Sequence, residues 1–467
     1  MLDIQLSEEQ EAVITKFTAR ESIVVMGKAG TGKSVILREL KKQAEETGRV
    51  GFVCAPTGVA AINVDGITIH KLISTLYSTR DTARLVSSLD YIIIDEVSML
   101  RCDLFDDLNK ALQFYNKSAK LFGAVQMVLI GDCGQLPPVV KSGSAEDEFI
   151  KDNYLSCFFF SAACYARHTW VVVELTNIFR QTGDTSADYK QLLNMVRDGE
   201  NVKTVKALNN LFKTDTPVGV VLSTTNRGAD EINDYMLNTL PGASSTFKAT
   251  TSGNIKEYEY PAPGELVLKL DAKVMVIRNI YDAGELELVN GDWGTIVALN
   301  EGYTESDLLG ETPDKYTPES ITIRCERTND IHTIYPYVWD KKEVVYDNKL
   351  KMLTERSVAS FIQYPLRLAW AVTIHKSQGA TLDKYTIDLR KPMFAAGQLY
   401  VALSRGTTLD GLNIIGKVRK KDVMVCEVVN GFLRDHTTGV GIKEGGIHDE
   451  KSITEIFEAR ATQNTPF

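Results

Sequence analysis

One short segment, Gly27–Ser34, limits more than any other what this chain can fold into. It reads GKAGTGKS and matches GxxxxGK(S/T), with an apolar run, Ser22–Met26, before it and a stretch of helical spacing that ends at Gly48 after it. In that context the glycines let the backbone turn so that successive N–H groups face phosphate oxygens. Lys33 then reaches the terminal phosphates, and the Ser34 hydroxyl can ligate Mg²⁺. The segment predicts a nucleotide-binding loop, which we favour over a glycine-rich turn with an incidental lysine.

Short apolar runs alternate with helical patterns up to about residue 180. The runs are Ser22–Met26, Val50–Cys54, Tyr91–Ile94, Val125–Ile130 and Trp170–Leu175. Because they are apolar on both faces, they predict buried parallel strands. Strand–helix alternation of this kind predicts an α/β sheet covered by helices on both faces.

The sequence pattern predicts that the chain divides into four parts. Residues 1–182 form the first α/β domain, and residues 183–262 together with 362–430 form a second one. Between its halves, residues 263–361 show short alternating strands separated by turns such as Asn290-Gly291-Asp292, which predicts an inserted antiparallel β-barrel. Residues 431–467 form a tail with a short helix opened by Ser452 and Glu455, to which we assign no function.

An acidic pair, Asp95-Glu96, follows the apolar run Tyr91–Ile94. Asp95 would hold Mg²⁺, and Glu96 would orient or deprotonate an attacking water. Such a pair is weak by itself, but its place after a buried strand downstream of the phosphate loop makes it a strong sign of an ATPase. Arg180 and Arg405 could complete the site by stabilising phosphate charge, although for each arginine considered alone we favour a surface or ion-paired position.

The composition of the chain says more about its cellular compartment than about the reaction it catalyses. The net charge of −9 argues weakly against nucleic acid, yet a local basic groove can sit on an acidic body. No apolar run reaches the ~18 residues that would cross a bilayer, and the N-terminus lacks a targeting pattern. The seven cysteines form no CxxC pair and no zinc-ligand spacing with the six histidines. We expect an intracellular protein in a reducing compartment, without a membrane segment or structural metal.

A series of ordered motifs resembles the PIF (petite integration frequency) family of DNA helicases, in the 5′-to-3′ branch of superfamily one. The resemblance spans roughly residues 5–418. It rests on LSEEQ, GKAGTGKS, APTGVAA with GITIH, IIIDEVSML, FGAVQMVLIGDCGQLPP, ELTNIFRQ, LAWAVTIHKSQGATL and GQLYVALSRG. Each motif alone could mislead, but their order is highly specific.

The resemblance gives roles to the residues around the nucleotide. Gln10 would hydrogen-bond the adenine edge, and Gln135 would sense the γ-phosphate. The phosphate-loop residues would bind ATP, Ser34 and Asp95 would hold Mg²⁺, and Glu96 would act on the water. These loop residues are Gly30, Thr31, Gly32, Lys33 and Ser34. Arg180 and Arg405 match the family's two arginine fingers, so closure of a cleft between two domains would be tied to hydrolysis.

The family resemblance also implies contacts with single-stranded DNA. The residues concerned are Thr57, Gly58, His70, Thr373, His375 and Lys376. Hydroxyls, backbone amides and a lysine can hold phosphates without reading sequence, and imidazole faces can stack on bases. Either histidine considered alone would more often be structural.

The family resemblance further implies two RecA-like domains with parallel sheets, an SH3-like barrel at 263–361 and a strand-splitting wedge near 66–86. Lys71 departs from the serine of many relatives and would add a phosphate contact or a solvated charge. The long terminal extensions of eukaryotic relatives are absent, which favours the cytoplasm of a bacterium or phage host over the nucleus or mitochondrion. We expect a protein that is monomeric when free, binds single-stranded, forked or structured DNA such as G-quadruplexes, and serves replication, repair, recombination or telomere-type maintenance.

Other interpretations remain open on the residues alone. A RecD- or Dda-like helicase, or one of opposite polarity, would share most of these motifs. A P-loop phosphotransferase would explain the phosphate loop but not the second set of motifs, and DNA-independent ATPase would favour it. A non-catalytic nucleic-acid binding module is disfavoured by the complete set of Lys33, Asp95 and Glu96.

Overall fold

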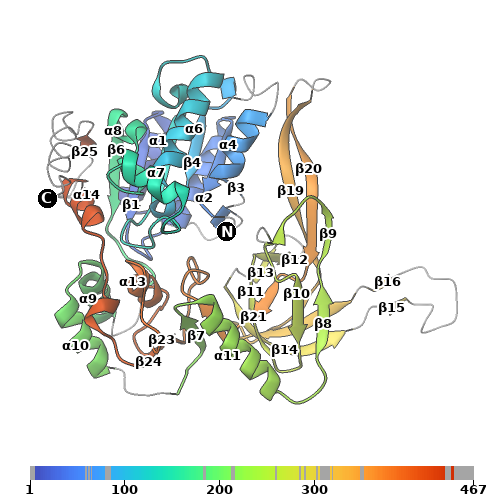
Figure 1. The fold of residues 1–467 in the computed structure, drawn as a ribbon. Coiled ribbons are helices and arrows are strands. Elements are labelled where there is room, and N and C mark those ends of the chain that lie inside the picture. The colour runs from blue at the N-terminus through green and yellow to red at the C-terminus, as the bar shows by residue number, and fades with distance from the viewer. Residues whose placement is uncertain are drawn as a thin grey trace. The chain divides into compact units, whose positions relative to one another are not determined.

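The computed structural model divides the chain into two compact units, drawn as ribbons in Figure 1. Unit 1 comprises Met1–Phe179 with Cys426–Phe467, and unit 2 comprises Arg180–Val425. The structure describes residues 6–57, 60–61, 64, 66–78, 86–181, 186–211, 216–257, 260–282, 285–288, 291–300, 303–304, 316–317, 319–347, 352–436 and 443–445. The wedge segment predicted near 66–86 is therefore described mainly over 66–78, and the helix predicted at Ser452 lies outside the described residues.

Unit 1 is built on a seven-stranded sheet of order β25-β6-β1-β5-β4-β2-β3. Its strands are β1 (Ile23–Gly27), β2 (Gly51–Ala55), β3 (Ile67–Thr68), β4 (Tyr91–Ile94), β5 (Gln126–Gly131), β6 (Trp170–Leu175) and β25 (Lys443–Gly445). All neighbouring pairs are parallel except β25 with β6. The five apolar runs form β1, β2, β4, β5 and β6, and this confirms the predicted parallel α/β sheet.

Helices pack against this sheet and cover its apolar strands (Figure 1). The helices of unit 1 are α1 (Glu8–Thr18), α2 (Lys33–Glu46), α4 (Ile69–Ser78), α6 (Cys102–Tyr115), α7 (Ala145–Asn153), α8 (Ala163–Arg167) and α14 (Glu427–His436), with 3₁₀ turns η1 (Val97–Met99), η2 (Leu121–Ala124) and η3 (Phe159–Ser161). Helix α1 begins at a capping box between Ser7 and Gln10. Helix α2 ends just before Gly48, whose φ of 64° is easy only for glycine and stops the helix as predicted.

Unit 2 contains a four-stranded parallel sheet of order β22-β7-β23-β24. The strands are β7 (Val220–Ser223), β22 (Ala371–Thr373), β23 (Tyr385–Asp388) and β24 (Leu412–Ile415); the helices are α9 (Ser186–Arg197), α10 (Asn201–Leu211), α11 (Asn226–Thr239) and α13 (Gln398–Leu403), with η5 (Lys420–Asp422). Strand β7 precedes the antiparallel region in the chain and the other three follow it, so segments from both sides of that region share one sheet.

The antiparallel region of unit 2 is wider than residues 263–361. It comprises β8 (Ser245–Lys248), β9 (Thr250–Gly253), β10 (Glu265–Leu268), β11 (Lys273–Val276), β12 (Ile280–Asp282), β13 (Glu285–Leu288), β14 (Trp293–Asn300), β15 (Tyr303–Thr304), β16 (Tyr316–Thr317), β17 (Ser320–Cys325), β18 (Ile331–Ile334), β19 (Tyr337–Asp347), β20 (Met352–Gln363) and β21 (Leu366–Leu368). The largest sheet has the order β18-β17-β14-β11-β21, and a second sheet has the order β19-β20-β9. Buried Gln363 links these strands to β8 and the loop before β10, because its amide donates to the carbonyls of Phe247 and Pro263.

The chain returns to unit 1 after Val425. Helix α14 packs there because the ring of Phe432 stacks on Phe160, with centroids 4.2 Å apart, and meets Phe159 and Tyr165 edge-on. The sequence analysis placed residues up to 430 in the second domain, whereas the compact units divide at Cys426. Within the described part of the chain, no helix is both long and apolar enough to cross a membrane.

Candidate functional site

The phosphate loop joins β1 to α2 in a conformation that requires glycine. Gly30 and Gly32 have φ values of 82° and 83°, which residues with a Cβ adopt only under strain. Gly32 is also the N-cap of α2 and supplies no side-chain acceptor to the first N–H groups of the helix. The turn therefore leaves backbone donors and the positive end of a helix dipole for a phosphate.

Lys33 lies across this loop. Its Nζ donates to the carbonyl oxygens of Gly27 at 2.8 Å and Lys28 at 2.9 Å. The hydroxyl of Thr31 donates to the same Lys28 carbonyl at 2.9 Å, which ties the loop together. Ser34, in the first turn of α2, is exposed. The loop thus places an ammonium and a hydroxyl at the helix start, as binding of a metal–triphosphate requires.

Gln10 and Phe179 border the loop. The Gln10 Oε1 accepts the N–H of Ser7 at 3.0 Å, and its Nε2 donates to the carbonyl of Thr31 at 3.5 Å. The N–H of Phe179 donates to the Gly30 carbonyl at 2.8 Å, while its side chain is 57% exposed. The sequence analysis quoted Phe179 only as part of ELTNIFRQ. The place of Phe179 next to Arg180 in the motif was the one sequence signal that could have drawn attention to it. The exposure of its side chain beside the phosphate loop could not be predicted from sequence.

The acidic pair lies at the end of β4. The N–H of Asp95 donates to the carbonyl of Cys54 at 2.9 Å, which continues the pairing of β4 with β2. Burial, reinforced by the adjacent charge of Glu96, raises the pKa of Asp95 above its usual range, and Lys33 opposes that rise. Glu96 adopts φ 51° and ψ 43°, a left-handed conformation that costs a non-glycine residue about 1–2 kcal/mol. Such strain commonly marks a functional position.

Gln135 follows β5 and is buried. Its Nε2 donates to Asp132 Oδ2 at 3.4 Å, and its N–H donates to the Asp132 carbonyl at 3.0 Å. Because β5 lies between β1 and β4 in a parallel sheet, the phosphate loop, the acidic pair and Gln135 all follow the carboxyl ends of neighbouring strands. The structure therefore brings the residues predicted in unit 1 for nucleotide chemistry to one edge of one sheet.

The two predicted arginine fingers meet at the end of α13, inside unit 2. Arg180 Nη1 donates to the Ser404 carbonyl at 3.0 Å, and Gln181 Nε2 donates to the Gly406 carbonyl at 3.1 Å. Buried Arg405 donates to Ser404 Oγ at 2.9 Å and to several backbone carbonyls. These carbonyls belong to Val401, Ser377 and Ala380, at 2.9, 3.5 and 3.4 Å. Arg180, Gln181 and Arg405 therefore belong to one hydrogen-bonded network around the end of α13. The spacing of these residues in the sequence did not predict that network.

Two buried tyrosines hold the same turn. The hydroxyls of Tyr189 and Tyr385 donate to the Leu403 carbonyl at 2.5 and 2.8 Å. A Cβ on Gly406 would lie 2.4 Å from the Tyr189 hydroxyl, so a larger residue here would displace that hydroxyl. The sequence analysis missed both tyrosines, because only the fold brings them to α13.

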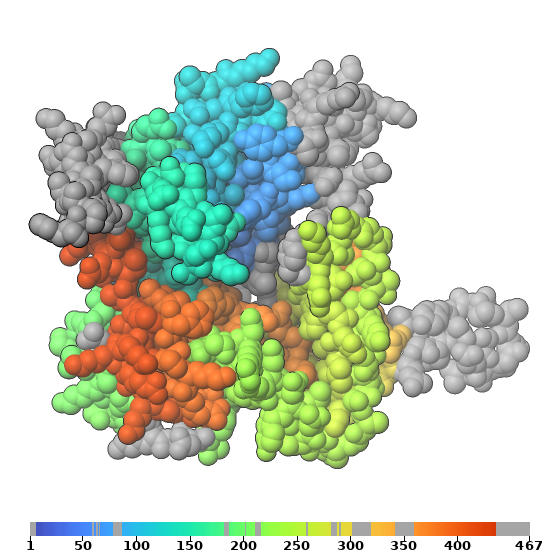
Figure 2. All heavy atoms as spheres, viewed as in Figure 1, coloured from blue at the N-terminus to red at the C-terminus, as the bar shows by residue number. Residues whose placement is uncertain are grey.

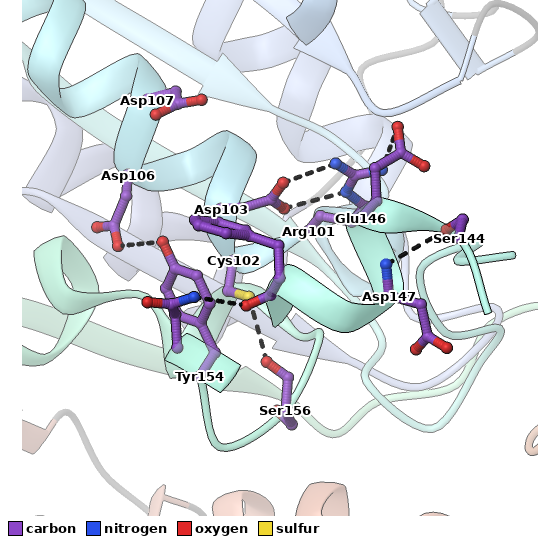
Figure 3. A network of polar contacts seen from close by, with 12 residues as sticks. Arg101, Cys102, Asp103, Asp106, Asp107, Ser144, Glu146, Asp147, Tyr154 and Ser156 are labelled. Atoms are coloured by element: carbon purple, nitrogen blue, oxygen red, sulfur yellow. Dashed lines mark hydrogen bonds and ion pairs between the residues drawn. The ribbon is translucent and has the colours of Figure 1, made fainter. Parts of the chain in front are cut away.

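The residues of unit 1 that were predicted to contact single-stranded DNA lie in different local environments. The Thr57 hydroxyl accepts the N–H of Ala60 at 3.2 Å, and Gly58 lies outside the described residues. His70 is an exposed residue at the start of α4. Partial burial of its ring lowers its pKa, and the positive charge of Arg101 lowers it further. Arg101 is paired with Asp103 at 2.6 Å and reaches Glu146 at 3.7 Å, within the polar network of Figure 3.

In unit 2 the predicted strand contacts form a turn after β22. Buried Thr373 accepts the N–H of Lys376 through its hydroxyl at 3.2 Å. His375 is half-buried and Lys376 is exposed, and burial lowers the pKa of both side chains. The turn therefore presents an imidazole and an ammonium at the carboxyl end of a parallel strand.

The sheet and site of unit 1 define a P-loop nucleotide-binding protein of the α/β class. A family model described as PIF1-like helicase matches residues 5–207. Among curated proteins, the ATP-dependent DNA helicase PIF1 of Homo sapiens is 32% identical over 430 residues, which cover 88% of this chain and 61% of that protein. The ATP-dependent DNA helicase Pif1 of Psychrobacter sp. (strain PRwf-1) is 31% identical over 448 residues, which cover 85% and 66%.

Solved structures agree. Bacteroides sp Pif1 in complex with ADP-AlF4 has a TM-score of 0.79 and 29% identity, and the match covers 95% of this chain and all of that one. A structure of two coordinating Pif1 helicases at forked dsDNA has a TM-score of 0.64 and 30% identity, with 93% and 97% covered. The chain belongs to the PIF1-like helicase family, which confirms the resemblance read from the motifs. It spans about three fifths of the length of the first curated relatives it matches.

Proposed function

We propose that this protein is an ATP-dependent DNA helicase that moves 5′ to 3′ on single-stranded DNA and separates duplex DNA ahead of it. The observation that carries the proposal is the gathering of Lys33, Asp95, Glu96 and Gln135 at one edge of the unit 1 sheet. Two further facts support it: relatives bear the name ATP-dependent DNA helicase, and a structural neighbour is Bacteroides Pif1 bound to ssDNA.

The loop residues fit a metal–nucleotide. Gly30 and Gly32 have the positive φ values that turn backbone N–H groups inward, and the helix start has no side-chain cap. Bound ATP would supply the phosphoanhydride bond that is cleaved, and Mg²⁺ would neutralise charge on its phosphates. Lys33 would exchange the carbonyls of Gly27 and Lys28 for the terminal phosphates, while Ser34 and Asp95 would hold the metal.

Other residues would act on the water and on the base. The Glu96 carboxylate would orient the attacking water and accept its proton, and Gln135 would respond to the γ-phosphate. Gln10 would bind the edge of the adenine, and the exposed ring of Phe179 offers a face on which that base could stack.

The arginines would couple hydrolysis to movement. Arg180 and Arg405 belong to unit 2, whereas the phosphate loop belongs to unit 1, so their contribution would make turnover depend on both units. A phosphate-stabilising arginine is typically worth about 10³–10⁵ in rate. We expect Arg405→Ala to lose turnover and keep nucleotide affinity; loss of affinity would instead indicate a structural role.

The strand would be held by residues of both units. We assign phosphate or base contacts to Thr57, Gly58, His70 and the Thr373–Lys376 turn. In this proposal the two parallel sheets are RecA-like domains, the antiparallel region is an SH3-like barrel, and the segment near 66–86 is the wedge. We expect the protein to be a monomer when free of DNA.

Two partial duplexes, one with a 5′ and one with a 3′ single-stranded tail, test the proposal directly with purified protein and Mg²⁺-ATP. We expect unwinding of the 5′-tailed duplex alone, and none with Lys33→Ala. Unwinding of only the 3′-tailed duplex would keep the motor but reverse the polarity. ATPase that ignores DNA, without unwinding, would favour a phosphotransferase.

A further inference from the structure

Among the phenylalanines of unit 2 that the structure describes, one is displayed to solvent. Phe394, in the loop between β23 and α13, is 61% exposed, whereas the described phenylalanines Phe247 and Phe361 are buried. Its ring lies nearly parallel to that of His375, with an interplanar angle of 13° and centroids 5.9 Å apart. Two flat rings from different loops thus face the same way at the carboxyl edge of the parallel sheet.

The exposed ring stands on a fixed backbone. The N–H of Phe394 donates to Gln398 Oε1 at 3.0 Å, and fully buried Gln398 donates to the Thr224 carbonyl at 3.2 Å. The N–H of neighbouring Met393, itself buried, donates to Asp422 at 3.1 Å. The loop on both sides is therefore anchored in the unit, and the exposure of Phe394 does not arise from a loosely held segment.

Basic side chains lie next to the two rings in the sequence. Lys376 is exposed next to His375. Arg390 and Lys391 precede Phe394, with side chains 64% and 51% exposed, and pair with Asp388 at 2.7 Å and Glu231 at 3.5 Å. Lys391 lies near the start of α11, because its Nζ is 3.7 Å from where a Cβ on Gly228 would stand. In Figure 2 the yellow-green atoms around α11 border the orange atoms of the β22–α13 segments on one face of this unit.

These neighbours favour a nucleobase over an apolar partner. Burial lowers the pKa of His375, so the imidazole is neutral at pH 7 and presents an uncharged face. Ring faces beside an exposed ammonium suit a polymer that alternates flat bases with phosphates, because the ammonium of Lys376 can hold a phosphate beside a stacked base. A purely hydrophobic partner would instead have to cover the exposed ammonium of Lys376, which lies next to His375.

We propose that Phe394 and His375 form a platform on which one base of single-stranded DNA stacks, while Lys376 holds an adjacent phosphate. The inference rests on the proposed function and adds Phe394 to it, a residue that no motif argument identified. Base–aromatic stacking tolerates any base, as a motor that moves along arbitrary sequence requires.

The test separates stacking from charge. Fluorescence anisotropy would measure the affinity of wild type, Phe394→Ala and Phe394→Trp for a labelled oligothymidylate and for an abasic strand of the same length. Stacking predicts that Phe394→Ala binds oligothymidylate about 5- to 150-fold more weakly. Phe394→Trp should retain wild-type affinity, and on the abasic strand all three proteins should bind alike. Tyr235→Ala, which removes another exposed aromatic side chain of unit 2, is the matched control and should not change either affinity.

Each outcome has a distinct meaning. Equal losses of Phe394→Ala on both strands would overturn the platform, because the missing base would then not matter. Unchanged affinity of Phe394→Ala for oligothymidylate, alongside weaker binding by Lys376→Ala, would also overturn it while leaving the proposed function intact. Failure of the wild type to bind either strand would instead refute the proposed function.

Discussion

The two glycines at the ends of α2 offer a matched pair of substitutions. Gly32 before the helix and Gly48 after it both have left-handed backbone, with φ of 83° and 64°. Alanine in this conformation costs about 1–2 kcal/mol. Around Gly48 nothing lies within 4 Å of an added Cβ, whereas at Gly32 the Cβ would stand 2.5 Å from Gln10 Nε2. The backbone cost is thus shared, and only Gly32→Ala disturbs a neighbour.

Gly48→Ala should lower the free energy of unfolding by about 1–2 kcal/mol, which corresponds to roughly 2–8 °C in melting temperature for a unit of this size. Its affinity for nucleotide should not change. Gly32→Ala should cost the same stability and in addition displace Gln10 or the loop. A displacement worth about 1.4 kcal/mol of binding free energy weakens nucleotide affinity about tenfold.

Thermal unfolding followed by circular dichroism, and titration with a fluorescent ATP analogue in Mg²⁺, would measure both quantities on the same samples. Nucleotide affinity of Gly32→Ala equal to that of Gly48→Ala would refute the reasoning, because it would show that the loop absorbs the added methyl group. Loss of nucleotide binding in Gly48→Ala would refute the reasoning as well, because Gly48 follows the end of α2 that is opposite the phosphate loop.

Three further expectations follow from other contacts. Lys33→Ala should abolish ATP hydrolysis while circular dichroism shows an unchanged fold; near-normal hydrolysis would contradict the loop assignment. Tyr385→Phe removes one of two donors to the Leu403 carbonyl, so it should cost about 1 kcal/mol of stability and lower kcat more than it raises KM for ATP; a change in KM alone would count against a positioning role. Burial lowers the pKa of His168 from 6.5 to about 4, so the folded state holds it neutral. Its contribution to stability is therefore complete above pH 6.5 and is lost as the pH falls towards 4. In urea unfolding at pH 7.5 and 4.5, His168→Phe should remove up to about 3 kcal/mol of the acid-induced loss, and an equal loss in both proteins would show that other groups dominate.

Much of unit 1 could be predicted from sequence because its signals are local. A run of apolar residues such as Tyr91–Ile94 can be buried on both faces only in a covered sheet, so the strand and its parallel pairing follow. The phosphate loop likewise carries its geometry in its glycines. Neighbouring parallel strands then bring the acidic pair and Gln135 to the loop.

The features that sequence reasoning missed depend on distant contacts. Phe179 and Phe394 differ from core phenylalanines only in exposure, which no spacing reveals. The acceptors of Arg405 include the carbonyls of Ser377 and Ala380, which precede it in the sequence by 28 and 25 residues. The pairing that carries the antiparallel strands beyond residues 263–361 is also distant, because β9 pairs with β20 across about a hundred residues of sequence.

The stacking of Phe432 on Phe160 can form only late in the synthesis of the chain. The part of unit 1 that contains Phe160 is synthesised before unit 2, but α14 is made only after the whole of unit 2. At typical rates of 5–20 residues per second, the face around Phe160 waits on the order of tens of seconds for its cover. A nascent chain therefore carries an uncovered aromatic surface throughout the synthesis of its second unit. A message truncated before α14 would leave that surface permanently open to aggregation or to a chaperone.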